Sequence, residues 1–115
     1  MALTIYHNPR CSKSRQTLAL LEEKGHAPRI VKYLETPPDA AELGKLLDLL
    51  GLEPRQLMRK KEAPYRELGL DGPAKDRQAL IAAMVANPIL IERPIVVADG
   101  KARLGRPPEA VLEIL

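Results

Sequence analysis

The chain has few of the residues that cross-link, stack or anchor a protein. Its 115 residues include one cysteine, Cys11, and three aromatic side chains, all of them tyrosine. A single cysteine excludes an internal disulfide and a cysteine-based zinc site. So few aromatic residues argue against base-stacking recognition of nucleic acid, and a net charge of +3 is too small to indicate such a partner.

Long hydrophobic runs are also missing. The longest apolar stretch, LIAAMVANPILI, is interrupted by Asn87 and Pro88 and is too short to span a bilayer. The N-terminal segment turns polar directly after Tyr6, so we expect no secretory signal. We therefore expect a cytoplasmic protein with no membrane partner, in a compartment that keeps a free thiol reduced.

The N-terminal third predicts a β-α-β unit. The apolar run LTIY (3–6) reads as a strand that ends at the loop-forming pair Asn8-Pro9. Residues 14–25 show helical periodicity and stop at Gly25, and RIVKYL (29–34) reads as a second strand. Strands joined in this way normally lie parallel.

The middle of the chain reads as a block of helices over about 36–87. TPPDAAELGKLLDLLG (36–51) predicts a helix capped by Thr36. Its apolar face comprises Leu43, Leu46, Leu47 and Leu50. Short helices are expected over 54–61 and 63–70, followed by an amphipathic helix over 76–87.

The C-terminal part predicts a β-hairpin and a final helix. Asp99-Gly100 between two β-prone runs is a strong signal for a two-residue hairpin turn, and the helix follows over 107–115. The whole order predicts one α/β domain over 1–115, with a helical insertion between the β-α-β unit and the hairpin plus helix.

The one cysteine stands in a cationic loop. The segment YHNPRCSKSR contains no acid, and the cationic or titratable neighbours of Cys11 are His7, Arg10, Lys13 and Arg15. The loop joins a predicted strand to a predicted helix, whose positive N-terminal end stabilises an anion. These features favour the thiolate of Cys11, a nucleophile, with the Ser14 hydroxyl within reach in the first helical turn.

Two other interpretations of Cys11 stay open. It could be a buried structural cysteine, although such residues usually have apolar neighbours, or an ordinary thiol beside solvated cations. His7 could equally be a surface residue with no role. A two-cysteine redox motif is excluded because Ser14 occupies the second position, so any redox cycle needs a thiol from another molecule.

A pair of arginines flanks the hairpin. Extending the register outward from Asp99-Gly100 places Arg93 opposite Arg106, where like charges repel. An anion between them would remove the repulsion, either Glu92 or a bound oxyanion that suits the arginine fork. Alternatively, both side chains extend into water. Pro94 is a candidate for a cis peptide bond.

Five segments carry a resemblance to a known family. They are IYHNPRCSKSRQTL, YLETPP, LMRKKEAPYRELGL, NPILIERPIVV and RLGRPPEAVLEIL. In this order, over residues 4–115, they resemble the glutaredoxin-coupled arsenate reductases, and most closely a short bacterial branch of that family. The resemblance implies a thioredoxin-like fold with a helical insertion. The chain departs from well-studied members at Arg10, where they carry a small residue, and it ends at Leu115 without their C-terminal extension.

The resemblance also implies roles for particular residues. Cys11 matches the nucleophile, His7 a residue that helps to keep it ionised, and Ser14 the hydroxyl near the thiolate. Three further matches, Arg59, Arg93 and Arg106, correspond to the arginines that bind the substrate oxyanion. Pro94 corresponds to the structural cis-proline of the thioredoxin-like fold.

The implied activity is reduction of arsenate to arsenite through a covalent Cys11 thiol–arsenate intermediate. Arsenate, glutathione and glutaredoxin are the implied partners, with glutathione as co-substrate and no metal or bound organic cofactor, and we expect a monomer. One alternative is a glutathione-linked thiol oxidoreductase, which the Cys-x-x-Ser pattern suits. Another is a thioredoxin-fold regulator that binds RNA polymerase, although those with a redox switch carry Cys-x-x-Cys.

Overall fold

The chain divides into two compact units. The computed structural model describes residues 2–73 and 75–115. One unit comprises the residues up to Thr36 together with Arg93–Leu115, and the other comprises Pro37–Glu92. The second unit holds the predicted helical block and extends past residue 87, since the Glu92 N–H donates to the Leu57 carbonyl group at 2.7 Å. That both units form one domain stays a prediction.

The first unit is built on a four-stranded sheet in the order β2-β1-β3-β4. Its strands are β1 (Leu3–His7), β2 (Arg29–Lys32), β3 (Ile95–Ala98) and β4 (Lys101–Leu104). β1 pairs with β2 in parallel, as predicted, and with β3 in antiparallel orientation. The end of β1 therefore lies between the end of β2 and the start of β3, and the loop that follows carries Cys11.

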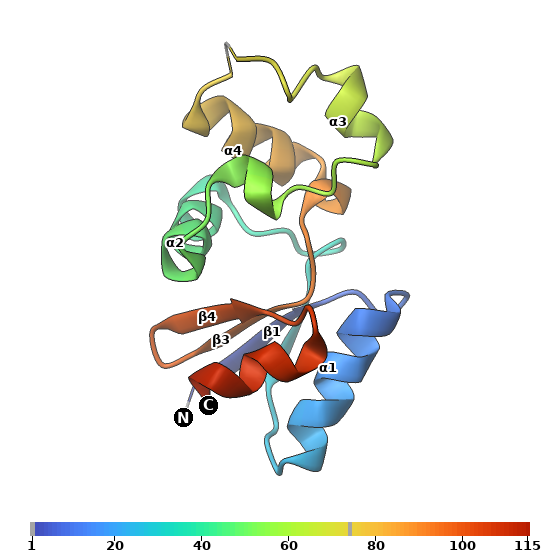
Figure 1. Ribbon diagram of the computed structural model, residues 1–115, viewed down its shortest axis with the longest axis vertical. Coiled ribbons are helices and arrows are strands. Elements are labelled where there is room, and N and C mark those ends of the chain that lie inside the picture. Colours follow the sequence, from blue (N-terminus) through green and yellow to red (C-terminus); the bar gives the residue numbers. More distant parts are fainter. Residues whose placement is uncertain (1, 74) are drawn as a thin grey trace. The chain divides into compact units, whose positions relative to one another are not determined.

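Two helices cover one face of this sheet, as Figure 1 shows: α1 (Ser12–Glu23) and the C-terminal 3-10 helix η3 (Pro108–Ile114). Leu21 of α1 and Val111 of η3 are fully buried against Ile5 and Val96 of the strands. Burying side chains of this size stabilises the fold by about 1.5–3 kcal/mol each. This core anchors the start of α1, where the cysteine lies.

The final helix has a tighter winding than an ordinary α-helix. Its inward-facing residues recur at every third position: Pro108 and Val111 are buried, and Ile114 packs against the same core. In a 3-10 helix side chains at i and i+3 align, so this spacing gives a single buried stripe. The predicted helix over 107–115 is confirmed as a helix of this type.

The predicted hairpin is confirmed in turn and register. β3 and β4 pair in the expected way up to Ile95 opposite Leu104. Both turn residues have positive φ, 48° at Asp99 and 79° at Gly100. Such a turn matches the twist of the two strands, and it needs residues that tolerate positive φ.

The second unit is helical. It contains α2 (Ala40–Leu50), α3 (Ala63–Glu67) and α4 (Arg77–Ala86), with the 3-10 helices η1 (Pro54–Leu57) and η2 (Pro88–Leu90). The expected apolar faces of α2 and α4 form its core. Buried members of these faces are Leu43, Leu46, Leu47, Leu80, Ile81 and Met84.

The predicted start of α2 was wrong. Thr36 does not cap the helix; the cap is Asp39, whose carboxylate accepts a hydrogen bond from the Glu42 N–H at 2.8 Å. The proline pair explains the difference, because Pro38 disfavours helical backbone at Pro37. The helix therefore begins only after both prolines.

The predicted helix over 54–61 was too long. Only Pro54–Leu57 is helical, and Met58 then forms an isolated bridge with Ile91. The Arg59 N–H donates to the Leu90 carbonyl group at 2.7 Å instead of to its own turn. Pairing with a distant segment thus ends the helix, which local propensity cannot show.

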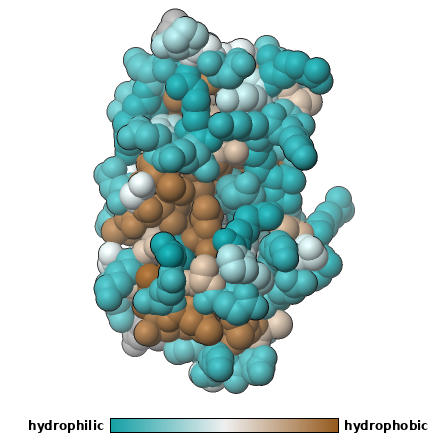
Figure 2. Space-filling view, viewed as in Figure 1, coloured by the Kyte–Doolittle hydropathy of each residue, from teal (hydrophilic) through white to brown (hydrophobic). Residues whose placement is uncertain are grey.

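Hydrophilic residues cover most of the visible surface in Figure 2, in line with a charged fraction of 29%. Among the described residues, no helix is long and apolar enough to cross a membrane. Within 2–73 and 75–115 there is also no group of three or more His, Cys, Asp or Glu side chains that could hold a metal ion.

Candidate active site

Cys11 occupies the N-cap position of α1, which confirms its predicted place at or near the N-terminus of this helix. Its backbone is extended there, with φ −92° and ψ 124°, and its N–H donates to the Asn8 carbonyl group at 3.0 Å. No acidic residue lies in the first turn of α1. The positive end of the helix dipole is therefore available to a negative charge at this position.

Cys11 is buried, which its polar sequence neighbours did not predict. Only 8% of the residue is exposed. Its surroundings are not simply apolar, because Arg106 Nη2 lies 3.8 Å from the Cys11 Sγ. A guanidinium at this distance stabilises a thiolate, and it does so more strongly in partly buried surroundings than in water. Burial and a cationic contact thus occur together at the thiol.

The hairpin holds Arg106 in this position. The Gly105 N–H donates to the Pro94 carbonyl group at 3.0 Å, which continues the β3–β4 pairing beyond the strands. Arg106 Nε then donates to the Arg93 carbonyl group at 2.9 Å. Arg93 is itself buried, with 8% exposed, and the Arg93–Pro94 and Arg106–Pro107 peptide bonds are cis. The structure therefore brings the two arginines together as the register required.

Gly105 is a positioning residue that the sequence interpretation missed. A Cβ atom at this position would lie 2.7 Å from Pro94 Cγ and would also collide with the Thr17 side chain. Thr17 is fully buried in α1, so it has little room to move. Only glycine allows the hairpin to approach α1 this closely, and this approach brings Arg106 to Cys11. The sequence around Gly105 carries no signal of this approach, because Thr17 is distant from it in the chain.

His7 and Ser14 form a buried polar pair beside the cysteine loop. Ser14 Oγ lies 2.6 Å from His7 Nδ1 and accepts a hydrogen bond from the Asn8 N–H at 3.0 Å. When His7 Nδ1 carries no proton, the Ser14 hydroxyl donates to it. To donate to the thiolate instead, the Ser14 hydroxyl must turn its proton away from His7 Nδ1, and this contact with the thiolate stays a prediction.

Burial lowers the pKa of His7 below its ordinary value of 6.5, and the positive charges of Lys32 and Arg15 lower it further. Lys32 is the direct β2 partner of His7 in the sheet. The ring is therefore neutral near neutral pH, so it does not act on the thiol as a cation there. His7 contacts Ser14, a sequence neighbour of Cys11, so the hydrogen bond to Ser14 is one route by which His7 can act on this loop.

The lowered pKa of His7 makes stability depend on pH. The unfolded chain takes up a proton at the ordinary value of 6.5, whereas folded His7 resists it. Acid therefore favours unfolding, and the free energy of unfolding should fall from about pH 7 to pH 5. The His7→Gln variant should lose this part of the fall in denaturant titrations, whereas His26→Gln, which retains His7, should keep it. An identical fall in wild type and His7→Gln would contradict the account.

The cations nearest to Cys11 in sequence are not the ones the structure places on its sulfur. Arg10, Lys13 and Arg15 are all exposed. The guanidinium of Arg15 donates from Nη1 to the Pro9 carbonyl group at 2.9 Å, which fastens the loop. The cation on the thiol is Arg106, 95 residues away in the chain.

Arg59 belongs to the second unit. Its Nη1 lies 2.6 Å from a carboxylate oxygen of Glu62, and its side chain is 28% exposed. The basic helix on which the sequence placed it ends at Leu57. Its role as an oxyanion ligand remains a prediction from the resemblance.

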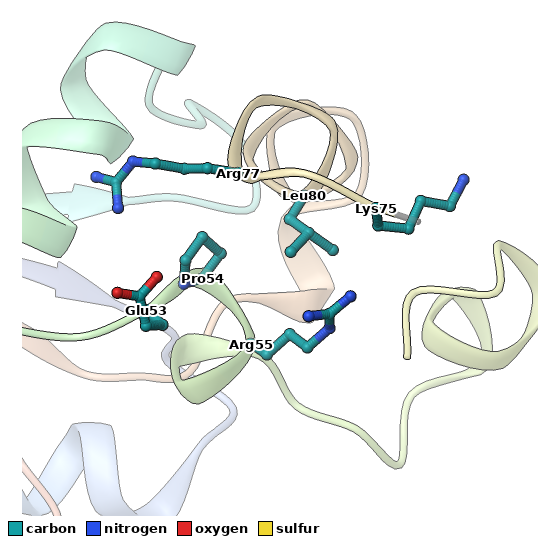
Figure 3. Close-up of a pocket in the computed structure, with 6 residues that line it drawn as sticks. All are labelled: Glu53, Pro54, Arg55, Lys75, Arg77 and Leu80. Atoms are coloured by element: carbon teal, nitrogen blue, oxygen red, sulfur yellow. The ribbon is translucent and has the colours of Figure 1, made fainter. Parts of the chain in front are cut away.

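A second cationic feature, a pocket of about 230 Å³, lies in the second unit (Figure 3). Its lining residues are Glu53, Pro54, Arg55, Lys75, Arg77 and Leu80. Arg55 donates to the carbonyl groups of Leu70 and Gly72, at 2.9 and 2.6 Å. Arg77 donates to the Asp48 carboxylate at 3.0 Å. These arginines hold loops and helices in place, and the lining contains no thiol or hydroxyl group. The candidate active site is therefore the one at Cys11.

Comparison with known proteins shows the family of this chain. The model of the ArsC family matches residues 6–114, a range that includes Cys11 and both arginines of the hairpin. The chain belongs to the ArsC family.

Two relatives are similar to this chain over nearly their whole length. Uncharacterized protein YfgD of Escherichia coli (strain K12) is 63% identical over 112 residues, which are 96% of this chain and 94% of the relative. The arsenate reductase of Neisseria meningitidis serogroup A / serotype 4A (strain DSM 15465 / Z2491) is 54% identical over 114 residues, 98% and 97% of the two chains.

A solved structure, the arsenate reductase from Vibrio cholerae, is 59% identical, with a TM-score of 0.98 and coverage of 100% of this chain and 98% of the other. The fold is thioredoxin-like, as it is in this family, and the predicted fold class is confirmed.

Proposed function

We propose that this ArsC-family protein reduces arsenate to arsenite, with Cys11 as the nucleophile. The observation that carries the proposal is the contact between the Cys11 Sγ and Arg106 Nη2, 3.8 Å apart, at the N-terminus of α1. A thiol at a helix N-terminus beside a guanidinium is favoured as a thiolate, and the same groups attract a tetrahedral oxyanion. Relatives named arsenate reductase support arsenate as that anion.

In the first step the Cys11 thiolate attacks the arsenic atom of arsenate. A sulfur–arsenic bond forms, one arsenate oxygen leaves as water after protonation, and arsenic stays in the +5 state. Arg106 and Arg93 stabilise the charged adduct from the hairpin side, and Arg59 is the third proposed ligand. Ser14 stabilises the thiolate when its hydroxyl proton is not donated to His7.

In the second step glutathione supplies the electrons. Its thiolate attacks the Cys11 sulfur, the sulfur–sulfur bond forms, and the sulfur–arsenic bond breaks. The electron pair of that bond stays on arsenic, which leaves in the +3 state as arsenite. Glutaredoxin then removes glutathione from Cys11 by a further thiol–disulfide exchange. The cycle needs no metal or bound organic cofactor, and it fits a cytoplasmic monomer supplied with glutathione.

The proposed role of Arg106 predicts a strong difference between arginine and lysine. Arg106→Lys retains the charge but cannot hold the Arg93 carbonyl group and the Cys11 sulfur at once with one planar fork. We expect kcat/KM for arsenate to fall by about tenfold or more. The matched control is Arg103→Lys in β4, three residues before Arg106, where the side chain is exposed and pairs with Glu113. Equal activity of the two variants would contradict the role.

The deciding experiment follows arsenate-dependent oxidation of NADPH with glutathione, glutathione reductase and glutaredoxin. Turnover that depends on arsenate supports the proposal. The Cys-x-x-Ser pattern of Cys11 and Ser14 also suits a glutathione-linked thiol oxidoreductase. Reduction of glutathionylated substrates with no arsenate turnover would favour that function instead.

A further inference from the structure

We infer that a pocket on the β2 side of the cysteine loop binds the peptide thiol that reduces the Cys11–arsenic adduct, an inference that rests on the proposed function for its role. The pocket has a volume of about 260 Å³. Pro9 and Arg10 line it from the loop that follows β1, and Lys32, Leu34 and Glu35 line it from the end of β2. All of these residues belong to the first unit.

The order of the sheet places this pocket and the arginines on opposite sides of the loop. The strands lie in the order β2-β1-β3-β4, and the cysteine loop follows β1. Arg93 precedes β3 and Arg106 follows β4, so both lie on one side, whereas Lys32 and Glu35 lie on the other. Displacement at sulfur proceeds with the attacking and leaving atoms on opposite sides. Arsenic that is bound to Cys11 and held by Arg106 therefore lies on the side of the arginines. The attacking thiol then approaches from the β2 side.

The charges of the pocket match a peptide thiol of the glutathione type. Such a molecule carries two carboxylates and one ammonium group at neutral pH. Arg10 and Lys32 supply two cations, and Glu35 supplies one carboxylate. Leu34 is 44% exposed and offers an apolar surface beside these charges. A small neutral thiol would gain nothing from this arrangement.

The two cations of the pocket also lie near Cys11 in the chain and in the sheet. Arg10 directly precedes Cys11, and Lys32 is the sheet partner of His7, four residues before Cys11. In glutathione the thiol-bearing residue is central, with the glycine carboxylate at one end and the glutamate α-carboxylate at the other, on a longer arm because that residue is linked through its γ-carboxyl group. Holding both ends over the loop leaves the central thiol free to reach Cys11.

The chemical step is the second step proposed above. The peptide thiolate attacks the Cys11 sulfur, a disulfide forms, the sulfur–arsenic bond breaks, and arsenic keeps the electron pair. Arg10 and Lys32 take no part in bond breaking. They raise the local concentration of the anionic thiol and orient it, so they should affect its KM more than the KM for arsenate.

The first test measures both Michaelis constants in the coupled assay. Arg10→Ala should raise the KM for glutathione about five- to tenfold, the loss expected for one charge-assisted contact, with the KM for arsenate within about twofold. Lys101→Ala removes an exposed cation at the hairpin turn and is the matched control. An unchanged KM for glutathione in Arg10→Ala, or equal changes in both constants, would overturn the site.

The second test needs no arsenate and therefore separates this site from the proposed function. Mass spectrometry follows the transfer of glutathione from glutathione disulfide to Cys11, beside the reaction with neutral 2-hydroxyethyl disulfide. Arg10→Ala should slow only the first reaction, about fivefold. Equal slowing of both reactions would mean that Arg10 acts on the thiolate itself, and the site would be wrong. If wild type shows the charge preference but no arsenate turnover, the proposed function fails and the site stands.

Discussion

Replacing Cys11 by serine should lower arsenate reduction by at least about a thousandfold. A serine hydroxyl is not ionised at neutral pH, so the first attack on arsenic becomes very slow. An oxygen atom also cannot form the mixed disulfide with glutathione, so the electron-transfer step has no route. The measurement is arsenite formation by wild type and variant under identical concentrations of arsenate, glutathione and glutaredoxin.

The Cys11→Ser variant should remain folded, which keeps this test interpretable. The change replaces one atom in a buried residue at the N-cap of α1, a position where serine is a favoured residue. We expect a free energy of unfolding within about 1 kcal/mol of wild type. Arsenite formation at more than a tenth of the wild-type rate by a folded Cys11→Ser protein would contradict the mechanism.

Replacing Gly105 by alanine should destabilise the first unit and displace Arg106. The added Cβ would lie 2.7 Å from Pro94 Cγ and would overlap the buried Thr17 side chain, so the hairpin must move away from α1. Overpacking of this kind costs about 1–3 kcal/mol. Because Arg106 follows directly, we also expect the KM for arsenate to rise. Urea unfolding and the coupled assay measure the two effects.

Gly44→Ala is the matched control for this substitution. Gly44 lies inside α2, and a Cβ there would meet only Ile81 Cδ1, at the ordinary contact distance of 3.9 Å. Alanine in a helix interior is better than glycine by about 0.5–1 kcal/mol, so this variant should be more stable than wild type. If Gly105→Ala were as stable and active as Gly44→Ala, the close approach at Gly105 would not position Arg106.

Local patterns were enough to predict the strands that frame the site, although not the antiparallel pairing of β1 with β3. The β-α-β unit, the stop at Gly25 and the turn at Asp99-Gly100 each depend on residues close together in sequence. Gly25 has a φ of +87°, a value that few other residues adopt easily. Because a hairpin with a two-residue turn has only one register, the same pattern also placed Arg93 beside Arg106. The proximity of these two arginines was therefore predicted without any long-range information.

Other features of the site depend on contacts between distant residues, which periodicity cannot show. Cys11 is buried although its sequence neighbours are polar, and its cationic contact comes from Arg106. His7 reads as a cation in sequence, but burial and Lys32 on the neighbouring strand lower its pKa. Gly105 has no unusual sequence context; it matters because Thr17 and Pro94 converge on it.

The helical unit shows the same limit in its boundaries. Helical periodicity predicted the apolar faces of α2 and α4. The cap of α2 is Asp39 and not the predicted Thr36, because of the proline pair. The segment after Leu57 is not helical, because it pairs with residues 90–92. The role of Arg59 came from the resemblance alone, since an arginine in a basic segment gives no signal of its own.

The most direct test of the central claim is a single turnover without glutaredoxin. Wild-type protein is mixed with arsenate and glutathione, and mass spectrometry of the intact and digested protein is compared with the arsenite released. We expect one glutathione attached at Cys11 for each arsenite formed. Arsenite released while Cys11 stays unmodified, or glutathione attached at Cys11 with arsenate left unreduced, would contradict the claim.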